Sequence, residues 1–345
     1  MALIGALPGG LALVNVVSCM LFGAISGSAV ATTSAIGSFM LPEMKKAGYE
    51  PNFSAAVTAA ASTTGMLIPP SNILIVYAIA SGGVSIAALF MAGYIPGIMV
   101  GLALMLVCFI YAKMKGYPLS PRLPIKVVVE KTIAALPSLF LIFLVIGGIV
   151  GGVFTATEAG AIAVVYSLLL AVVFYKEVDA KALPDIFLKA AETTAIVMLL
   201  IAASTAMSWL LSFENIPQTL SNALLSISDN PLLILLLINL LLIVVGAFLD
   251  MTPAVLIFTP IFLPVALELG MSELQFGIML VLNLSIGLCS PPVGAVLFIT
   301  CAIAKTKLEN IIRPLIPLYV AMFVVLMLVT YVAWFSEALP RALEF

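Results

Sequence analysis

The sequence predicts an all-α integral membrane protein, built as an inverted repeat with two re-entrant helical hairpins and two discontinuous helices. Of its 345 residues, 63% are hydrophobic and only 9% are charged, whereas soluble domains carry roughly 25% charged residues. Apolar runs long enough to cross a bilayer follow one another along the chain. Two of these runs are interrupted by Pro-Pro at equivalent places of two similar halves, which indicates an internal repeat.

Composition also excludes several classes of function. The net charge is −2, so the chain offers no basic surface for nucleic acid. The sequence contains no His, which excludes His-based zinc sites and Ser-His-Asp triads. The four Cys residues stand in apolar surroundings without CxxC spacing, and we interpret them as buried small hydrophobes.

Two of the apolar runs, 9–41 and 231–267, are too long for one crossing, because spanning the hydrocarbon takes about 20 residues. Each carries a polar break near its middle, at Ser26-Gly27-Ser28 and at Asp250-Met251-Thr252-Pro253. A re-entrant hairpin, which enters and leaves the membrane on the same side, explains both runs. The other apolar runs are 52–81, 85–112, 132–152, 159–175, 190–212, 275–304 and 315–336.

With both long runs treated as hairpins, the basic residues gather on one side of the membrane. Of the 14 Lys and Arg residues, all but Arg341 share the side of the N-terminus. Because cytoplasmic loops carry the excess of Lys and Arg, that side is predicted to be cytoplasmic. The cytoplasmic set is Lys45, Lys46, Lys113, Lys115, Arg122, Lys126, Lys131, Lys176, Lys181, Lys189, Lys305, Lys307 and Arg313.

The two halves are related by a constant offset of 222 residues, which separates Gly65 from Gly287. Since the halves begin on opposite sides of the membrane, the repeat is predicted to be inverted. The crossings in 132–212 have no counterpart before residue 9, so we expect the N-terminal scaffold of the first repeat to be absent from this chain. The other pairs at this offset are Pro69 and Pro291, Pro70 and Pro292, Pro42 and Pro264, and Gly48 and Gly270.

Each Pro-Pro segment is predicted to unwind a helix near the middle of the membrane, because proline lacks an N–H and clashes with the preceding turn. The freed backbone of residues 68–72 and 290–294 would offer carbonyls to a cation, and the half-helix that follows would favour an anion at its N-terminus. Ser71 and Asn72 add side-chain donors, and Gly294 lets a ligand approach the backbone. The alternative is a proline kink in an ordinary packed helix.

The first hairpin tip supplies a further candidate site. Ser26-Gly27-Ser28 is followed by the hydroxyl residues Thr32, Thr33 and Ser34. Together with the backbone of residues 65–70, this tip would form a cage of carbonyls and hydroxyls for sodium, since hard cations prefer oxygen ligands. The alternative is close helix packing through small residues.

The second tip contains the only acid deep inside an apolar run, Asp250, with Thr252 beside it. Charge inside a membrane is expensive and usually functional, so Asp250 is a candidate for cation coordination or substrate contact. The alternative is a protonated carboxyl that is hydrogen-bonded in packing. No Lys or Arg lies deep in any run, so an anionic substrate would depend on half-helix N-termini, hydroxyls, Asn72 and a co-bound cation.

Six longer stretches, which together extend along essentially the whole chain, resemble one family of membrane proteins. This family is the large membrane subunit of tripartite ATP-independent periplasmic (TRAP) transporters. The resemblance implies an elevator-type, sodium-coupled importer of small carboxylates, surrounded by lipid in the bacterial inner membrane. It also implies two protein partners, a periplasmic substrate-binding protein and a small four-helix membrane subunit. The stretches are GAISGSAVATTSAIGSFMLPEMKKAGYE, GMLIPPSNILIVYAIA, AGYIPGIMVG, GGIVGGVFTATEAGAIAVVY, GAFLDMTPAVLIFTPIFLPVALELGM and LCSPPVGAVLF.

Carried over by motif, the resemblance implies two sodium sites and one substrate site between the hairpin tips. The family usually has Thr where this chain has Ser290, so the hydroxyl is kept. The first sodium site would involve Ser26, Gly27, Ser28, Gly65 and Pro69. The second would involve Asp250, Thr252, Gly287 and Ser290. The substrate would lie near Ser28, Ser71, Asn72, Asp250 and Gly294.

The leading hypothesis is a secondary transporter in which residues 9–81 and 231–304 move as a transport domain against a scaffold of residues 85–212 and 315–336. The alternative is a standalone sodium/dicarboxylate symporter without a binding protein. An intramembrane enzyme would need a second deep carboxylate, a His or a buried Lys, and the sequence offers none of these. The substrate is left open among C4-dicarboxylates, 2-oxo acids, sugar acids and sialic acid.

Overall fold

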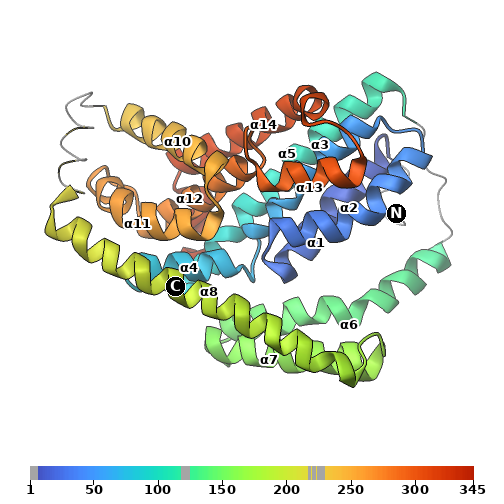
Figure 1. The fold of residues 1–345 in the computed structure, drawn as a ribbon, viewed down its shortest axis with the longest axis horizontal. Helices are drawn as coiled ribbons and strands as arrows, with labels where there is room; N and C mark the ends of the chain where they lie inside the picture. Colours follow the sequence, from blue (N-terminus) through green and yellow to red (C-terminus); the bar gives the residue numbers. More distant parts are fainter. Residues whose placement is uncertain (1–6, 118–124, 217–218, 220–222, 224–229) are drawn as a thin grey trace. The chain divides into compact units, whose positions relative to one another are not determined.

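The computed structural model describes residues 7–117, 125–216, 219, 223 and 230–345, and every regular element in these ranges is a helix (Figure 1). The all-α prediction is therefore confirmed for the described chain. Two compact units are formed, one by Met1–Arg122 with Leu210–Phe345 and the other by Leu123–Trp209. Arg122, one of the basic residues predicted on the cytoplasmic side, lies outside the described residues.

The first long run is broken into two helices of the larger unit, α1 (Gly10–Ser26) and α2 (Ala29–Lys46), which pack against each other. Gly27 turns the chain with a φ of 61°, a conformation that glycine adopts without a steric cost at Cβ. Ser28 then caps α2, because its side chain accepts a hydrogen bond from the N–H of Ala31. The break lies where the sequence predicted it.

The run 52–81 is interrupted at the first Pro-Pro segment. α3 (Pro51–Ser62) leads into a short 3-10 turn at Thr64–Met66, and α4 (Asn72–Ala80) resumes the run. The peptide bond between the two prolines is cis. No hydrogen bond among the described residues is formed to the carbonyls of residues 67–70. The Leu67 oxygen instead packs against Gly93, where a Cβ would lie 2.3 Å from it, so the carbonyls of residues 68–70 are the ones that stay candidates for a ligand.

The second half has the same succession of elements. α10 (Pro231–Phe248) and α11 (Met251–Glu268) follow one another across a break at residues 249–250. α12 (Glu273–Leu288) and α13 (Ala295–Ala304) flank the second Pro-Pro segment, whose prolines are also joined by a cis bond. α2 and α11 begin and end 222 residues apart, and α3 and α12 begin 222 residues apart.

The halves contact each other in a crosswise manner within the larger unit. α2 packs against α13, and α4 packs against α11, so each hairpin touches the broken helix of the other half. α5 (Ile86–Lys115) and α14 (Leu308–Tyr331) pack against each other, and both contact α3 and α12. Figure 1 shows α5 and α14 beside α3, and α5 also contacts α4, which precedes it in the chain.

Buried amides join the hairpin helices to the broken helices. Asn15 of α1 donates a hydrogen bond to the Thr58 hydroxyl of α3 at 2.7 Å, and Asn283 of α12 donates to the side chain of Asn239 in α10 at 2.8 Å. All four side chains are fully buried. Each such bond between membrane helices contributes about 0.6 kcal/mol on average. These bonds therefore fix the position of one helix along the other more than they stabilise the fold.

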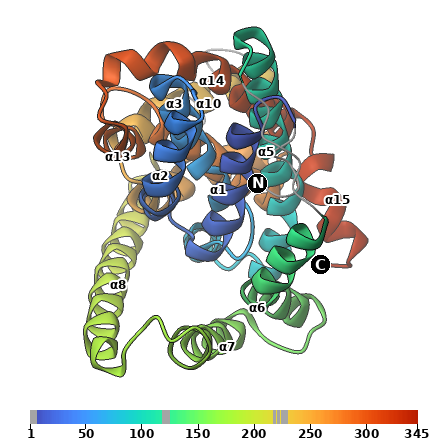
Figure 2. The ribbon, with the colours of Figure 1, turned by 90° about the vertical axis from the view of Figure 1, so that its right-hand side faces the viewer.

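The last apolar run, predicted at 315–336, has different bounds in the structure. α14 begins at Leu308, earlier than predicted. The prediction missed its first two turns because they contain Glu309 and Arg313, and a hydropathy pattern omits such charged helix ends. It ends at Tyr331, and a separate helix, α15 (Trp334–Ala342), then packs against α5 (Figure 2).

Arg341, the one basic residue predicted on the far side, is neutralised within α15. Its guanidinium group pairs with the carboxylate of Glu337 four residues earlier. Glu337 is buried and also accepts a hydrogen bond from the Ser272 hydroxyl. Because the positive-inside rule counts Lys and Arg and not net charge, Arg341 stays the one exception to the orientation that the other 13 basic residues predict.

The smaller unit contains α6 (Ile125–Val150), α7 (Ala156–Leu168), a π-helical continuation at Leu169–Phe174 and most of α8 (Leu183–Phe213). α6 packs against α7, and the Tyr166 hydroxyl donates to the Pro137 carbonyl at 2.8 Å. Thr155 and Glu158 form a capping box at the start of α7. The apolar windows of these helices are only 6% to 11% buried, which leaves apolar surface for lipid or other membrane helices.

Seven helices of the described chain are long and apolar enough to cross a membrane. This confirms a multi-pass integral membrane protein. The hairpin helices α10 and α11 are among them, so length alone does not distinguish a re-entrant helix from a crossing one, and the re-entrant depth stays a prediction. The segments are Ile86–Lys115, Thr132–Val150, Ala156–Phe174, Ala180–Leu211, Pro231–Phe248, Met251–Glu268 and Leu308–Tyr331.

Candidate substrate and cation site

Hydroxyl groups of the first hairpin tip form one connected cluster. The Ser26 hydroxyl lies 3.2 Å from the Thr32 hydroxyl, which donates to the Ser28 carbonyl at 2.8 Å. The Ser28 N–H donates to the Ser26 hydroxyl at 3.3 Å. Thr32 is fully buried, whereas Ser26 and Ser28 are half-buried. The tip therefore concentrates oxygen atoms of the kind that hard cations prefer. Thr32 belongs to this cluster together with Ser26 and Ser28.

This tip approaches the first unwound segment so closely that glycine is required. A Cβ on Gly27 would lie 2.9 Å from the amide oxygen of Asn72. A Cβ on Gly23 would lie 2.8 Å from the Cα of Gly65 and 3.4 Å from the Thr32 hydroxyl. The structure thus brings Gly27, Gly65 and Asn72, three of the predicted site residues, to the hydroxyl cluster.

The residues of the first unwound segment differ in what they offer to a ligand. Ser71 is fully buried, and its hydroxyl donates to the Met66 carbonyl at 2.5 Å, so its proton is used within the segment. Pro69 is buried as well. Asn72 is exposed at the first position of α4, where its amide and the unsatisfied N–H groups of the helix suit an anion.

Asp250 lies at the second hairpin break, immediately before α11, and is exposed. Its carboxylate forms no ion pair and no capping hydrogen bond among the described residues. The alternative, a carboxyl that is hydrogen-bonded in packing, finds no such bond at this break among the described residues, and the role of Asp250 in binding stays a prediction. Thr252 is half-buried in the first turn of α11.

The second hairpin also meets the helix that precedes its unwound segment through a glycine pair, because a Cβ on Gly246 of α10 would lie 3.1 Å from the Cα of Gly287 near the end of α12. The Ser290 hydroxyl donates to the Ile286 carbonyl at 2.9 Å, and the N–H of buried Gly294 donates to the Ser290 carbonyl at 3.0 Å. No hydrogen bond in the described chain joins Ser290 to Asp250 or Thr252. The groups predicted for the second sodium site are therefore not joined by hydrogen bonds as those of the first tip are.

One residue near the second segment was missed by the sequence reasoning. The Tyr319 hydroxyl of α14 donates to the Cys289 carbonyl and lies 3.0 Å from the Ser290 hydroxyl. The residue 222 positions earlier is Gly97, where a Cβ would lie 2.6 Å from the Ile68 side chain. Because Gly97 lies beside the first break, the internal repeat would have placed position 319 beside the second break. A single Tyr in an apolar run does not by itself indicate a functional residue.

Comparison with known proteins identifies the family. The family model described as "Tripartite ATP-independent periplasmic transporter, DctM component" matches residues 1–335. The chain belongs to this family. The resemblance that the motifs predicted is thus confirmed over nearly the whole chain.

Several relatives of this DctM-family chain carry transporter names. A C4-dicarboxylate TRAP transporter large permease from Pseudomonas aeruginosa is 39% identical, with 99% of this chain and 79% of that protein aligned. An isethionate TRAP transporter permease from Oleidesulfovibrio alaskensis is 40% identical, with 96% of this chain but only 52% of that protein aligned. A further relative whose name states no function, YgiK of Salmonella typhimurium, is 50% identical, with 98% of this chain and 78% of that protein aligned.

Membership of the DctM family defines the class of this protein. It is a large TRAP permease, the large membrane component of a three-part transport system that does not use ATP. Its named relatives are transport permeases, not enzymes. The family and the apolar helices place it in the inner membrane.

Proposed function

We propose that this chain imports a small organic acid across the bacterial inner membrane, driven by a sodium gradient, after a periplasmic binding protein delivers the acid. A small four-helix membrane subunit would complete the complex. The observation that carries the proposal is the close approach of each hairpin to the backbone that precedes a Pro-Pro break, at the glycine pairs Gly23–Gly65 and Gly246–Gly287, in a chain of the DctM family. The relatives named for C4-dicarboxylates and isethionate extend the substrate class from carboxylates to organic acids in general.

The proposed first sodium site uses oxygens that the structure brings together. Ser26, Ser28 and Thr32 contribute the hydroxyl cluster, and the carbonyls of residues 68–70, which accept no hydrogen bond among the described residues, would complete the cage. Gly27 and Gly65 let these two backbones approach. The proposed second site would use Asp250 and Thr252 with Ser290 and Gly287, and bound sodium would draw these groups together, since no hydrogen bond among the described residues connects them.

The proposed substrate site would lie between the two tips, near Ser28, Ser71, Asn72, Asp250 and Gly294. Asn72 and the N-terminus of α4 are the anion-binding groups on one side. No Lys or Arg lies deep in the apolar runs, so bound sodium would supply the positive charge that an organic acid needs. Sodium and substrate would therefore bind with positive cooperativity, which couples the two gradients.

We further propose an elevator motion in an inverted-repeat fold, supported by the 222-residue offset between matching helix bounds. The hairpins and broken helices, 9–81 and 231–304, form the moving body. Gly93 and Gly97 of α5 abut the unwound residues 67–68, and Tyr319 of α14 bonds to the second segment. These contacts favour placing α5 and α14 in the moving body, which narrows the scaffold proposed from the sequence to residues 123–209.

Uptake by reconstituted protein tests this function. Proteoliposomes containing the permease and its small subunit should accumulate a labelled organic acid only with the cognate binding protein outside and an inward sodium gradient. The screen would cover C4-dicarboxylates, 2-oxo acids, sugar acids, sialic acid and isethionate. Equal uptake with potassium in place of sodium would refute the coupling, and equal uptake without the binding protein would instead support a standalone symporter.

A further inference from the structure

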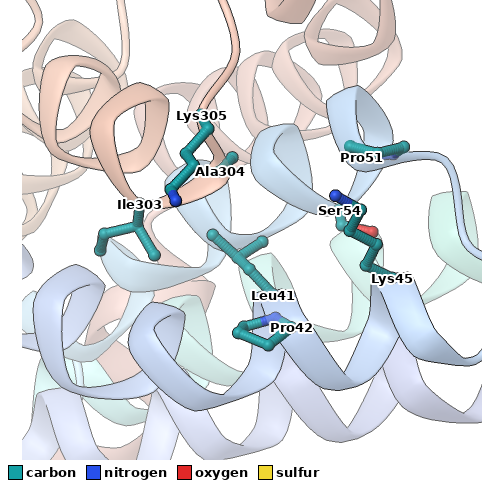
Figure 3. Close-up of a pocket in the computed structure, with 8 residues that line it drawn as sticks. All are labelled: Leu41, Pro42, Lys45, Pro51, Ser54, Ile303, Ala304 and Lys305. Carbon is teal, nitrogen blue, oxygen red and sulfur yellow. The ribbon is translucent and has the colours of Figure 1, made fainter.

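A pocket lies at the end of the first hairpin that is predicted to face the cytoplasm, away from the tips. Its volume is about 230 Å³. Three helices of the larger unit enclose it, namely the last turns of α2, the first turn of α3 and the end of α13 (Figure 3). The lining residues are Leu41, Pro42, Lys45, Pro51, Ser54, Ile303, Ala304 and Lys305.

The charges of this pocket are two ammonium groups without a counter-ion. Neither Lys45 nor Lys305 forms an ion pair among the described residues. The carboxylates nearest to Lys45 in sequence are already engaged, Glu43 with Lys46 at 2.7 Å and Glu50 with Lys115 at 3.8 Å. The pocket therefore carries two positive charges that no ion pair among the described residues neutralises.

The two lysines come from segments far apart in the chain that are held together by a specific contact. Lys305 follows α13 in a left-handed conformation, with a φ of 52°. The next residue, Thr306, donates its hydroxyl proton to the Asn52 side chain of α3 at 2.6 Å. In Figure 3, Lys305 lies with Ile303 and Ala304, whereas Lys45 extends toward Ser54 from the other side of the pocket.

The remaining wall is mostly apolar, with Leu41, Pro42, Pro51, Ile303 and Ala304. A cationic rim over an apolar wall suits an amphiphilic anion better than a small, fully hydrated one. The volume is below the roughly 300–1,000 Å³ of pockets for drug-sized ligands, so it accommodates a headgroup while acyl chains stay in the bilayer. Both lysines belong to the predicted cytoplasmic set, where anionic lipids attract basic residues.

We propose that this pocket binds the phosphodiester headgroup of an anionic phospholipid from the cytoplasmic leaflet. The two ammonium groups bind the phosphate, and the apolar wall receives the glycerol end of the acyl chains. Because the pocket joins hairpin α2 to α13 of the other half, the lipid stabilises this crosswise contact. The inference is independent of the transported solute.

Native mass spectrometry of the purified full chain, titrated with phosphatidylglycerol or with phosphatidylethanolamine, tests the proposal. Phosphatidylglycerol should bind more tightly, because it carries net negative charge. A lysine near an anionic headgroup contributes about 1 kcal/mol, or about fivefold in affinity. Lys45→Gln and Lys305→Gln should each weaken phosphatidylglycerol binding about fivefold, and the double variant about 25-fold.

Lys46→Gln is the matched control, since Lys46 is adjacent in sequence but pairs with Glu43 outside the pocket; it should leave binding unchanged. A photoactivatable phosphatidylglycerol should also cross-link to peptides containing residues 41–54 and 303–305. Equal binding of both lipids, or equal weakening by Lys46→Gln, would overturn the proposal. Displacement of phosphatidylglycerol by an equal concentration of inorganic phosphate would also overturn it, because the pocket would then hold a free anion. If the double variant does not fold, the two single variants and the cross-link decide.

Discussion

Replacing Gly65 or Gly287 by alanine is expected to reduce sodium-driven uptake by about tenfold or more. A Cβ on Gly287 would lie 2.5 Å from the Cα of Gly246, and a Cβ on Gly65 would collide with the Cα of Gly23. Rotation of a neighbouring side chain cannot relieve these contacts, since both neighbours are backbone atoms. Overpacking of this kind costs about 1–3 kcal/mol, and about 1.4 kcal/mol corresponds to a factor of ten.

The measurement is the initial rate of uptake in proteoliposomes, together with the unfolding temperature of each purified variant. Gly160→Ala is the matched control, because a Cβ on Gly160 in α7 has no neighbour within 4 Å. This control should transport at the rate of the unmodified protein. If Gly65→Ala and Gly287→Ala transport as fast as Gly160→Ala, the close seating of the tips on the unwound segments is not required for function.

Replacing Asp250 by asparagine is expected to raise the sodium concentration for half-maximal uptake by about tenfold or more. The substitution keeps the size of the side chain but removes the only acid deep in an apolar run. One negative charge next to a cation contributes several kcal/mol at an effective dielectric constant of about 20, and only part of it is recovered by an amide oxygen. The expected loss is therefore at least about 1.4 kcal/mol.

The sodium titration is made at saturating substrate, so that a defect in substrate binding alone would not shift it. Asp185→Asn is the matched control, an exposed acid in the first turn of α8 that is remote in sequence from both tips. An unchanged sodium requirement in Asp250→Asn, with wild-type unfolding temperature, would remove Asp250 from the proposed cation site.

The helix breaks of the hairpins and of the discontinuous helices were predictable from the sequence because their causes are local. Proline removes an N–H wherever it stands, and Gly27 supplies the positive φ that the first tip needs. The 222-residue offset then placed the second set of breaks. The start of α14 was not predictable from hydropathy, because its charged first turns are helical but lie outside the apolar run.

The partners of the site residues depend on contacts between distant segments, which no local pattern encodes. Tyr319 reaches the Cys289 carbonyl from 30 residues away. Ser71 was predicted as a substrate donor from its residue type, but its hydroxyl turns back to the Met66 carbonyl. The pairing of Arg341 with Glu337 could have been predicted from the sequence, because the two residues have the i, i+4 spacing of neighbours on a helix.

Protection of the hairpin tips by sodium is the most direct test of the central claim. Single cysteines at Ala31 and Leu249, exposed positions near the two tips, would be introduced into a Cys301→Ser background, since the other three native cysteines are buried. Labelling by a membrane-impermeant thiol reagent should slow severalfold in sodium relative to potassium at both positions. Equal labelling rates in the two salts at both positions would contradict a sodium site at the tips.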